Sequence, residues 1–218
     1  MALLLVAVFG STQVSTEAGL ITPSSSDSRF GFNVGDAGST GAVWDVFTDA
    51  SGPNSPDVFS YGSAVNSTLT ETSGNAFLTS GGNLYSFAGA TTFTVSFDST
   101  DLSGSTSRIV AQWVTLGTEL DYGAITLNGV TATFAEETGR DSVGGFGEQV
   151  SYLASWDLGS LAAIDSMELN FAASGAHMSL DQFRVDGFSA VPEPTSLALV
   201  GMAVVPLAMR RRRRGNRE

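Results

Sequence analysis

Residues that could carry out acid–base or nucleophilic chemistry are few in this chain. It has one histidine, His177, and no cysteine. A single histidine cannot build a histidine-rich metal site, and the lack of cysteine excludes thiolate ligands, thiolate nucleophiles and disulfides. The chain also lacks the Gly-x-Ser-x-Gly motif that presents a serine nucleophile, and it has no phosphate-binding glycine loop. We therefore expect His177 to lie in a turn or on the surface, near the start of a strand.

Paired carboxylates are the remaining route to catalysis. Glycoside hydrolysis needs two of them, about 5–5.5 Å or about 6.5–9.5 Å apart. Glu136 and Glu137 are adjacent, so on a strand they would point to opposite faces. The pairs that could act together are Glu119 with Asp121 and Glu148 with Asp157. Nothing in their spacing singles them out, and solvated loop carboxylates are the favoured interpretation.

The N-terminal third of the chain is rich in side-chain oxygens that could bind a cation. The residues concerned are Asp27, Asp36, Asp45, Asp49, Asn54 and Asp57. Oxygen-rich loops of this kind can hold Ca²⁺, but the spacing is not that of an EF-hand. We expect no cofactor and no metal, with Ca²⁺ as the one alternative.

Aromatic residues are the candidates for stacking against sugar rings. Beside three tryptophans the chain has four tyrosines, and the set comprises Trp44, Trp113, Trp156, Tyr61, Tyr85, Tyr122 and Tyr152. Packing in the core is the commoner fate of aromatics at strand spacing. Tyr122, in the loop sequence TELDYGA, is the one we expect to be exposed and to contact a ligand.

The charge of the chain is divided unevenly. All ten basic residues are arginine, and six of them lie in the last nine residues. Residues 19–191 contain four arginines and 19 carboxylate residues, a net charge of −15. Nucleic-acid phosphates need cationic neutralisation, so we expect no nucleic-acid partner. An acidic, solvated surface is the simplest interpretation.

Short apolar segments separated by Gly, Ser, Asn and Asp predict an all-β fold. The candidate strands are Phe30–Val34, Ala42–Phe47, Val58–Tyr61, Ala76–Thr79, Leu84–Phe87, Thr91–Phe97, Arg108–Leu116, Ala124–Leu127, Val130–Phe134, Gln149–Asp157, Ser166–Ala173 and Ser179–Phe188. Twelve strands in roughly 160 residues predict two packed sheets, an antiparallel β-sandwich of the jelly-roll, lectin-like kind, over residues 30–190. The polar residues 19–29 are expected to form a linker.

Several of these segments alternate with the period of two that is typical of half-buried strands. Phe93, Val95 and Phe97 form one such set, and further sets are Met167, Leu169, Phe171 and Val150, Tyr152, Ala154, Trp156. Asn128-Gly129 supplies the positive φ angles that a two-residue type I′ hairpin turn needs. Residues 108–116 are apolar on both faces, which indicates a central strand.

The N-terminus has features of a secretory signal peptide over residues 1–18. Leu3 to Phe9 form a continuous apolar stretch, and Thr16-Glu17-Ala18 offers small residues where a signal peptidase would cleave. The absence of Lys or Arg near Met1 is explained if the true start codon lies further upstream. The alternative is a buried N-terminal strand.

The C-terminus carries three features in order. Pro192-Glu193-Pro194 precedes a 15-residue apolar segment, 195–209, and then Arg210, Arg211, Arg212, Arg213 and Arg214. As a single hydrophobic helix, residues 195–209 would be about 22 Å long at ~1.5 Å per residue. A membrane core is about 30 Å thick, so the segment is short for a permanent span. The five arginines would hold this end in the cytoplasm by the positive-inside rule.

This tail, residues 191–218, resembles the PEP-CTERM sorting domain. The resemblance rests on the Pro-Glu-Pro tripeptide, the short hydrophobic helix and the arginine cluster. It implies that exosortase, a membrane transpeptidase-like enzyme, recognises residues 192–194 and removes the tail. It further implies export across the inner membrane of a Gram-negative-type, biofilm-forming bacterium that secretes exopolysaccharide. The segment HMSLDQFRVDGFSA ahead of it resembles the last strand of lectin-like modules.

Taken together, these features predict a non-enzymatic protein of the cell surface or extracellular matrix. Its expected partners are exosortase, the secretion machinery and, transiently through the tail, the inner membrane, with exopolysaccharide as the candidate ligand. One alternative is an extracellular hydrolase acting on polysaccharide. Another is a structural scaffold without a ligand. The single histidine and the lack of a nucleophile–base set favour the first function over the hydrolase.

Overall fold

The computed structural model describes residues 19–57, 59–102, 107–158 and 166–190. The expected signal peptide, residues 1–18, and the expected sorting tail with its helix, residues 191–218, lie outside these ranges. None of the helices in these ranges combines the length and the hydropathy that a membrane span requires.

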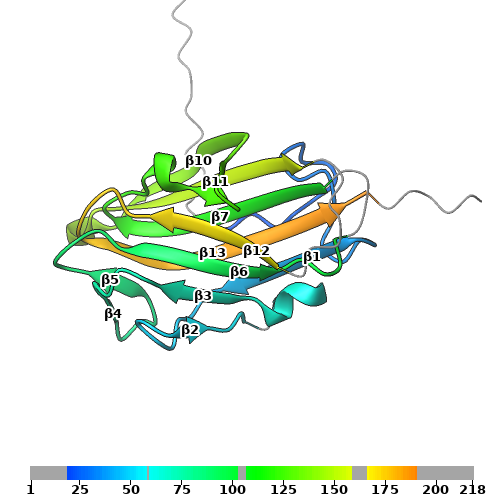
Figure 1. Ribbon diagram of the computed structural model, residues 1–218. Coiled ribbons are helices and arrows are strands. Elements are labelled where there is room, and N and C mark those ends of the chain that lie inside the picture. Colours follow the sequence, from blue (N-terminus) through cyan, green and yellow to red (C-terminus); the bar gives the residue numbers. More distant parts are fainter. Residues whose placement is uncertain (1–18, 58, 103–106, 159–165, 191–218) are drawn as a thin grey trace, which may run out of the picture.

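Two antiparallel sheets pack face to face, which confirms the all-β, two-sheet prediction (Figure 1). The large sheet has the order β10 (Phe134–Ser142), β11 (Glu148–Leu158), β7 (Ser107–Gly117), β13 (Met178–Ser189), β5 (Leu84–Ser86) and β4 (Ala76–Leu78), and β1 (Ser39–Trp44) also pairs with β13. The small sheet has the order β2 (Pro53–Asn54), β3 (Thr68–Glu71), β6 (Thr92–Asp98), β12 (Ser166–Ala172), β8 (Thr126–Leu127) and β9 (Val130–Thr131). Short 3₁₀ helices η1 (Gly62–Asn66), η2 (Tyr122–Ala124) and η3 (Gly144–Phe146) connect strands.

The predicted period-two segments do bury alternate side chains between the sheets. Phe93, Val95 and Phe97 of β6 are buried, and their neighbours on β12 are Met167, Leu169 and Phe171, also buried. The same holds for the predicted set on β11 from Val150 to Trp156. Burial of these side chains is the main source of stability, because each large apolar side chain contributes about 1.5–3 kcal/mol when fully buried.

Aromatic rings from both sheets meet at the centre of the core. Strand register places Trp44, Phe183, Trp113 and Tyr152 side by side across β1, β13, β7 and β11. The ring of Phe183 lies 5.4 Å from Trp44, 5.5 Å from Trp113 and 5.3 Å from Phe171 of the opposite sheet. Phe183 therefore joins the two sheets, and the three tryptophans of the sequence are all buried, as expected for core aromatics.

The predicted hairpin and the predicted central strand are also confirmed. Asn128 and Gly129 have φ angles of 49° and 77° and join β8 to β9. Strand β7 lies between β11 and β13, with hydrogen-bonded neighbours on both sides. A strand in this position is expected to carry apolar residues on both faces, because the core covers one face and the N-terminal segment covers part of the other.

Residues 19–32 pack across the outer face of the large sheet. Ile21 donates its backbone N–H to Oε1 of Gln112 at 2.8 Å, and Nε2 of Gln112 donates to the Ile21 carbonyl at 2.9 Å. Phe30 and Phe32 pack there against Val110 and Leu153. The predicted strand Phe30–Val34 is therefore wrong, because its phenylalanines bury themselves from turns rather than from a ladder. The polar residues 19–29, expected as a linker, are held on this face by the same contacts.

Three of the described strands, β10, β3 and β2, were not predicted, because their sequences are polar or very short. β10, with the sequence FAEETGRDS, is the edge of the large sheet, where one side of the ladder and much of the side-chain surface face water. Glu136 and Glu137 point to opposite faces, as expected, since one pairs with Arg29 and the other with Arg140. β3 is not an edge strand, since it lies between β2 and β6, but its sequence TLTE is polar. Of the predicted strand Val58–Tyr61, Tyr61 forms an isolated bridge to Gly41.

A buried ion pair lies where β1, β13 and Tyr61 meet. Nε and Nη2 of Arg184 donate to the two carboxylate oxygens of Asp186 at 2.6 and 2.8 Å. Oη of Tyr61 donates to the same carboxylate at 3.0 Å. Asp186 is fully buried, and burial raises its pKa while the Arg184 guanidinium offsets part of that rise. Gly41 leaves space for this pair, because a Cβ there would collide with Asp186 Oδ1 and the Tyr61 ring.

Candidate functional site

The outer face of the large sheet stays open where the N-terminal segment does not cover it. Register aligns Phe77, Tyr85, Ser179 and Leu116 in one row across β4, β5, β13 and β7. Their neighbours along the strands, such as Leu84 and Leu180, are buried in the core, so the row itself faces outward. The neighbouring strands β4 and β5 thus build one surface with β13 and β7, which are distant from them in sequence.

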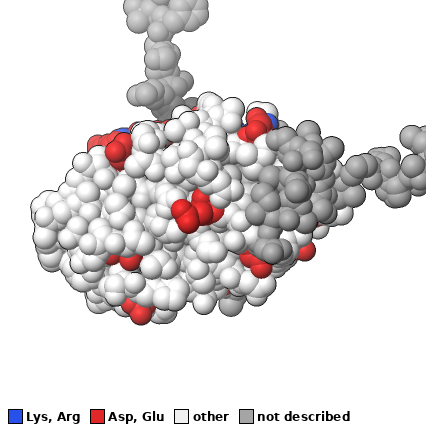
Figure 2. All heavy atoms as spheres, in the orientation of Figure 1, with Lys and Arg blue, Asp and Glu red and all other residues white. Residues whose placement is uncertain are grey.

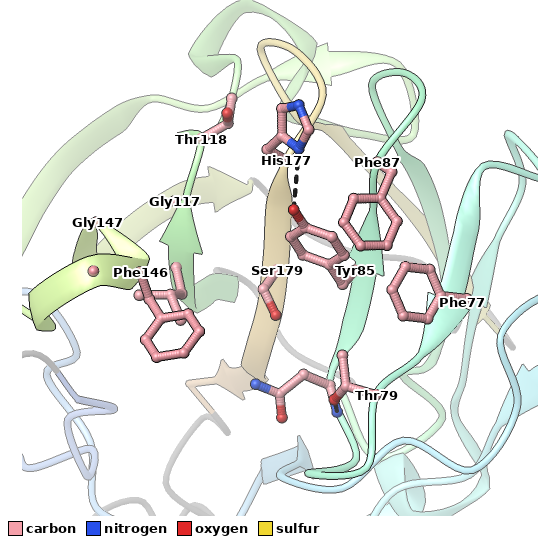
Figure 3. Close-up of a pocket in the computed structure, with 13 residues that line it drawn as sticks. Phe77, Thr79, Tyr85, Phe87, Gly117, Thr118, Phe146, Gly147, His177 and Ser179 are labelled. Atoms are coloured by element: carbon pink, nitrogen blue, oxygen red, sulfur yellow. Dashed lines mark hydrogen bonds between the residues drawn. The ribbon is translucent and has the colours of Figure 1, made fainter.

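This surface is hollowed into a groove of about 700 Å³, which we call the aromatic groove (Figure 3). It is lined by Phe77, Thr79, Asn83, Tyr85, Phe87, Leu116, Gly117, Thr118, Gly145, Phe146, Gly147, His177 and Ser179. The volume is within the range of about 300–1,000 Å³ that is common for small-ligand sites.

Aromatic rings form both sides of the aromatic groove. On one side the rings of Phe77 and Phe87 stack at 5.1 Å with an interplanar angle of 16°, and Tyr85 meets Phe87 edge-on at 4.7 Å. On the other side Phe146 projects from η3, and Ser179 lies between the two sides (Figure 3). Phe87 is 64% exposed and Phe146 is 78% exposed. Exposed rings gathered at a hollow are typical of a binding surface, because they offer flat apolar faces to a ligand.

A tyrosine–histidine pair closes one end of the aromatic groove. Tyr85 Oη and His177 Nδ1 are 3.0 Å apart, and the hydrogen bond is drawn in Figure 3. His177 lies directly before β13 with a φ of 70°, and its backbone N–H donates to the Ser86 carbonyl at 2.8 Å. Its carbonyl would be 2.5 Å from a Cβ at Gly117, so this close approach requires glycine there. The backbone therefore fixes the imidazole that holds the Tyr85 ring.

The amide of Asn83, a lining residue of the aromatic groove, is fixed by the carboxylate of Asp181. Nδ2 of Asn83 donates to Asp181 Oδ1 at 2.7 Å, and Nε2 of Gln149 donates to Asp181 Oδ2 at 2.9 Å. Asp181 lies at an irregularity in the pairing of β13 with β7, between Leu180 and Gln182. Burial raises its pKa, and the two amide bonds offset part of the rise. The Asn83 side chain is therefore preorganised.

The aromatic groove has no acidic side chain and no lysine or arginine among its lining residues. The arginines that the structure describes are also engaged elsewhere. Arg29 pairs with Asp27, Arg108 with Asp157, and Arg184 with Asp186. Arg140 pairs with Glu137, Glu119 and Glu148. Figure 2 shows scattered carboxylates and few basic atoms on the face in view.

Tyr122, the tyrosine predicted to contact a ligand, is 41% exposed but is not part of the aromatic groove. It belongs to η2, and its ring packs edge-on against Tyr152 at 5.6 Å. Burial and the carboxylates of Glu137 and Glu119 raise its pKa to about 12. Of the predicted stacking residues, Tyr85 is the one that the structure brings into the groove.

The structure places the members of the two candidate carboxylate pairs in different surroundings. Glu148 and Asp157 lie at opposite ends of β11 and cannot act on one bond, so that pair is wrong. Glu119 and Glu148 instead converge on Arg140, while Asp121 accepts a hydrogen bond from the Gly123 N–H at 2.9 Å. Hydrogen bonding to Arg140 lowers the pKa of Glu137 in this cluster. A carboxylate held ionised in this way is a poor general acid at neutral pH.

The acidic residues of the N-terminal third make local hydrogen bonds. Asp57 Oδ2 accepts from the Asp45 and Val46 N–H groups, and Asp49 Oδ1 accepts from Ser51 and Gly52. Asp27 pairs with Arg29, Asp36 accepts from the Asn33 N–H, and Asn54 accepts from Thr48 and Asp49. Within the described ranges, no group of three or more acidic or histidine side chains is placed to hold a metal ion.

Sequence reasoning missed the phenylalanines of the aromatic groove. Phe77, Phe87 and Phe146 were not considered as ligand contacts, because phenylalanine usually packs in the core. A signal was present: Leu84 and Tyr85 are adjacent on one strand, so Tyr85 and Phe87 must share the face opposite to buried Leu84. Phe146, flanked by Gly144, Gly145 and Gly147, also lacks a strand to direct it inward.

The other predicted site residues lie outside the described ranges. They are Pro192, Glu193, Pro194, Arg210, Arg211, Arg212, Arg213 and Arg214. Comparison with family models, with curated proteins and with solved structures found no significant match to this chain.

Proposed function

We propose that this chain is a non-enzymatic protein of the cell surface or extracellular matrix that binds polysaccharide in the aromatic groove. The observation that carries the proposal is the open hollow with aromatic rings on both sides and fixed polar groups between them. Sugars present apolar C–H faces and hydroxyl edges. The rings of Phe77, Phe87 and Phe146 suit the faces, and Asn83, Ser179 and Tyr85 suit the hydroxyls.

Export and sorting are proposed from the sequence of the tail. In this proposal exosortase recognises residues 192–194, and the inner membrane holds the chain transiently through residues 195–209. A jelly-roll, lectin-like arrangement of the two sheets belongs to the same proposal.

The position of strand β13 supports combining a sorted tail with a binding groove. The strand begins at Met178, beside the groove residues His177 and Ser179, and ends at Ser189, close to the start of the tail sequence. In Figure 1 it runs from the end of the molecule that carries β4 and β5 to the opposite end. Twelve strand residues span about 40 Å. The aromatic groove therefore lies far from the junction with the tail. If the chain is attached to the cell surface at that junction, the groove stays accessible to a ligand.

Replacing Phe87 by alanine should weaken polysaccharide binding by at least about tenfold, which corresponds to about 1.4 kcal/mol. Phe87 is the ring that both Phe77 and Tyr85 contact, so its loss also disturbs the stack. Affinity electrophoresis in gels that contain a polysaccharide measures the change. Phe134→Ala on β10 is the matched control, because this phenylalanine is exposed outside the groove. Equal affinity of both variants and the wild type, or release of reducing ends by the wild type, contradicts the proposal.

Replacing Glu193 by alanine should block removal of the tail. The uncleaved chain should then accumulate in the inner membrane fraction, because the tripeptide is the proposed recognition element. Immunoblots of membrane and external fractions report size and location in cells that contain exosortase. Glu168→Ala, an exposed carboxylate of β12, controls for loss of one negative charge. Export of Glu193→Ala at normal size and yield would overturn the sorting proposal.

A further inference from the structure

Three features of charge bear on which polysaccharide the aromatic groove accepts. The lining residues include no lysine or arginine, so an anionic sugar would find no cationic partner there. The four arginines of the described ranges are each paired with carboxylates, and none of them lines the aromatic groove. Asp181, which bonds the groove residue Asn83, adds a nearby carboxyl group.

The net charge of the domain as a whole also disfavours an anionic ligand. Residues 19–191 have a net charge of −15, and their field repels a polyanion before it reaches the aromatic groove. Burying a sugar carboxylate or sulfate against apolar rings without a counter-charge is costly, because the anion loses its hydration. A neutral sugar chain incurs neither penalty.

The form of the aromatic groove also fits a chain of flat rings. Its floor crosses β5, β13 and β7, which spans about 10 Å at the usual strand spacing. Phe77 and Phe87 stand on one side and Phe146 on the other, so a sugar ring between them meets apolar faces on both sides. Hydroxyl and amide groups of Ser179 and Asn83 remain for its edges.

We propose that the aromatic groove selects neutral polysaccharide chains and excludes polyanionic ones. The inference rests on the proposed function and narrows it, since the bacterial exopolysaccharides that could be ligands include both charged and uncharged polymers.

The test compares hydroxyethyl cellulose with carboxymethyl cellulose, which share a backbone and differ in charge. The full-length chain and its Phe87→Ala variant are titrated with each polymer at 20 mM and 300 mM NaCl. We define the groove-dependent affinity as the part of the affinity for a polymer that is lost when Phe87 is replaced by alanine. This definition separates binding in the groove from binding by the arginine-rich tail, which both chains carry. We expect it to be at least tenfold higher for the neutral polymer at 20 mM salt. The ratio should fall at 300 mM, because salt screens the repulsion.

A second variant adds the missing cation. Gly145 lines the aromatic groove, and a Cβ there would have no heavy atom within 4 Å, so the side chain of Gly145→Lys starts in open space. It should raise the groove-dependent affinity for carboxymethyl cellulose by at least fivefold at 20 mM salt. Thr131→Lys on β9 makes the same change of net charge outside the groove and should have little effect.

The outcomes separate the two proposals. If neither polymer shows groove-dependent binding, and none of a wider set of neutral and acidic polysaccharides does, the proposed function is overturned. If the groove binds the carboxymethylated polymer as tightly as the neutral one, the proposed function stands, but the proposed preference for neutral chains is overturned. An unchanged preference in Gly145→Lys would show that charge is not what selects the ligand, and it would also overturn this inference.

Discussion

Replacing Arg184 by methionine should lower the free energy of unfolding by about 3–5 kcal/mol. The substitution leaves the fully buried carboxylate of Asp186 with Tyr61 as its remaining side-chain partner. Methionine fills a similar volume, so the loss reports the uncompensated charge rather than a cavity. Urea denaturation followed by tryptophan fluorescence measures it, since all three tryptophans are buried.

The same variant should show a distinctive dependence on pH. Burial raises the pKa of Asp186 in the folded state, and loss of Arg184 removes the interaction that offsets this rise. A folded-state pKa above the unfolded value means that the folded protein binds the proton more tightly. Stability from this group is therefore present at low pH and is lost as pH rises through the folded pKa. The stability difference between wild type and Arg184→Met should accordingly shrink between pH 7 and pH 5.

A double variant is the control for this prediction. Arg184→Met with Asp186→Asn has no buried charge, so it should recover much of the stability that the single variant loses. If Arg184→Met costs less than about 1 kcal/mol at pH 7, or if the double variant is the less stable of the two, the ion pair does not have the role assigned to it.

Replacing Phe183 by alanine should cost about 3–5 kcal/mol of the free energy of unfolding. Its ring contacts Trp44 and Trp113 of its own sheet and Phe171 of the opposite sheet, so the cavity would open where the sheets meet. The rings around it are large and belong to different strands, which limits how far they can close the space. Equilibrium denaturation and near-ultraviolet circular dichroism measure the loss of stability and of tryptophan packing.

Phe59→Ala is the matched control, because the Phe59 side chain is 72% exposed. It should change the free energy of unfolding by less than about 0.5 kcal/mol. Similar losses in both variants would mean that the aromatic centre does not hold the sheets together.

The parts of the fold that could be predicted from sequence are strands whose apolar side chains follow a regular pattern. β6 and β12 alternate in polarity because one face of each packs in the core and the other faces solvent, whereas β11 and β7 are buried on both faces along most of their length and carry apolar residues on both. β10 was not predicted, because it lacks such an apolar pattern. As an edge strand it exposes both polar side chains and backbone, so its sequence resembles that of a loop.

The aromatic groove was beyond sequence reasoning because it depends on register between distant segments. Tyr85, Ser179 and Leu116 become neighbours only when β5, β13 and β7 pair in one particular alignment. Tyr85 was among the candidates on grounds of residue type, whereas nothing local distinguishes the outward-facing Phe77 from a core residue. Tyr122 was correctly expected to be exposed, but its neighbours are Tyr152 and the carboxylates around Arg140.

Strand β13 has a mechanical consequence if the chain is attached through its C-terminal end and holds a polymer in the aromatic groove. The pulling force would then run along the strand, from Ser179 toward Ser189. Antiparallel ladder hydrogen bonds lie perpendicular to the strand, so this force loads in shear the bonds to β7 along its whole length and those to β1 over its second half. Bonds loaded in shear share the force and must break together, whereas bonds loaded at one end open one after another. The topology therefore suits a tether that resists flow.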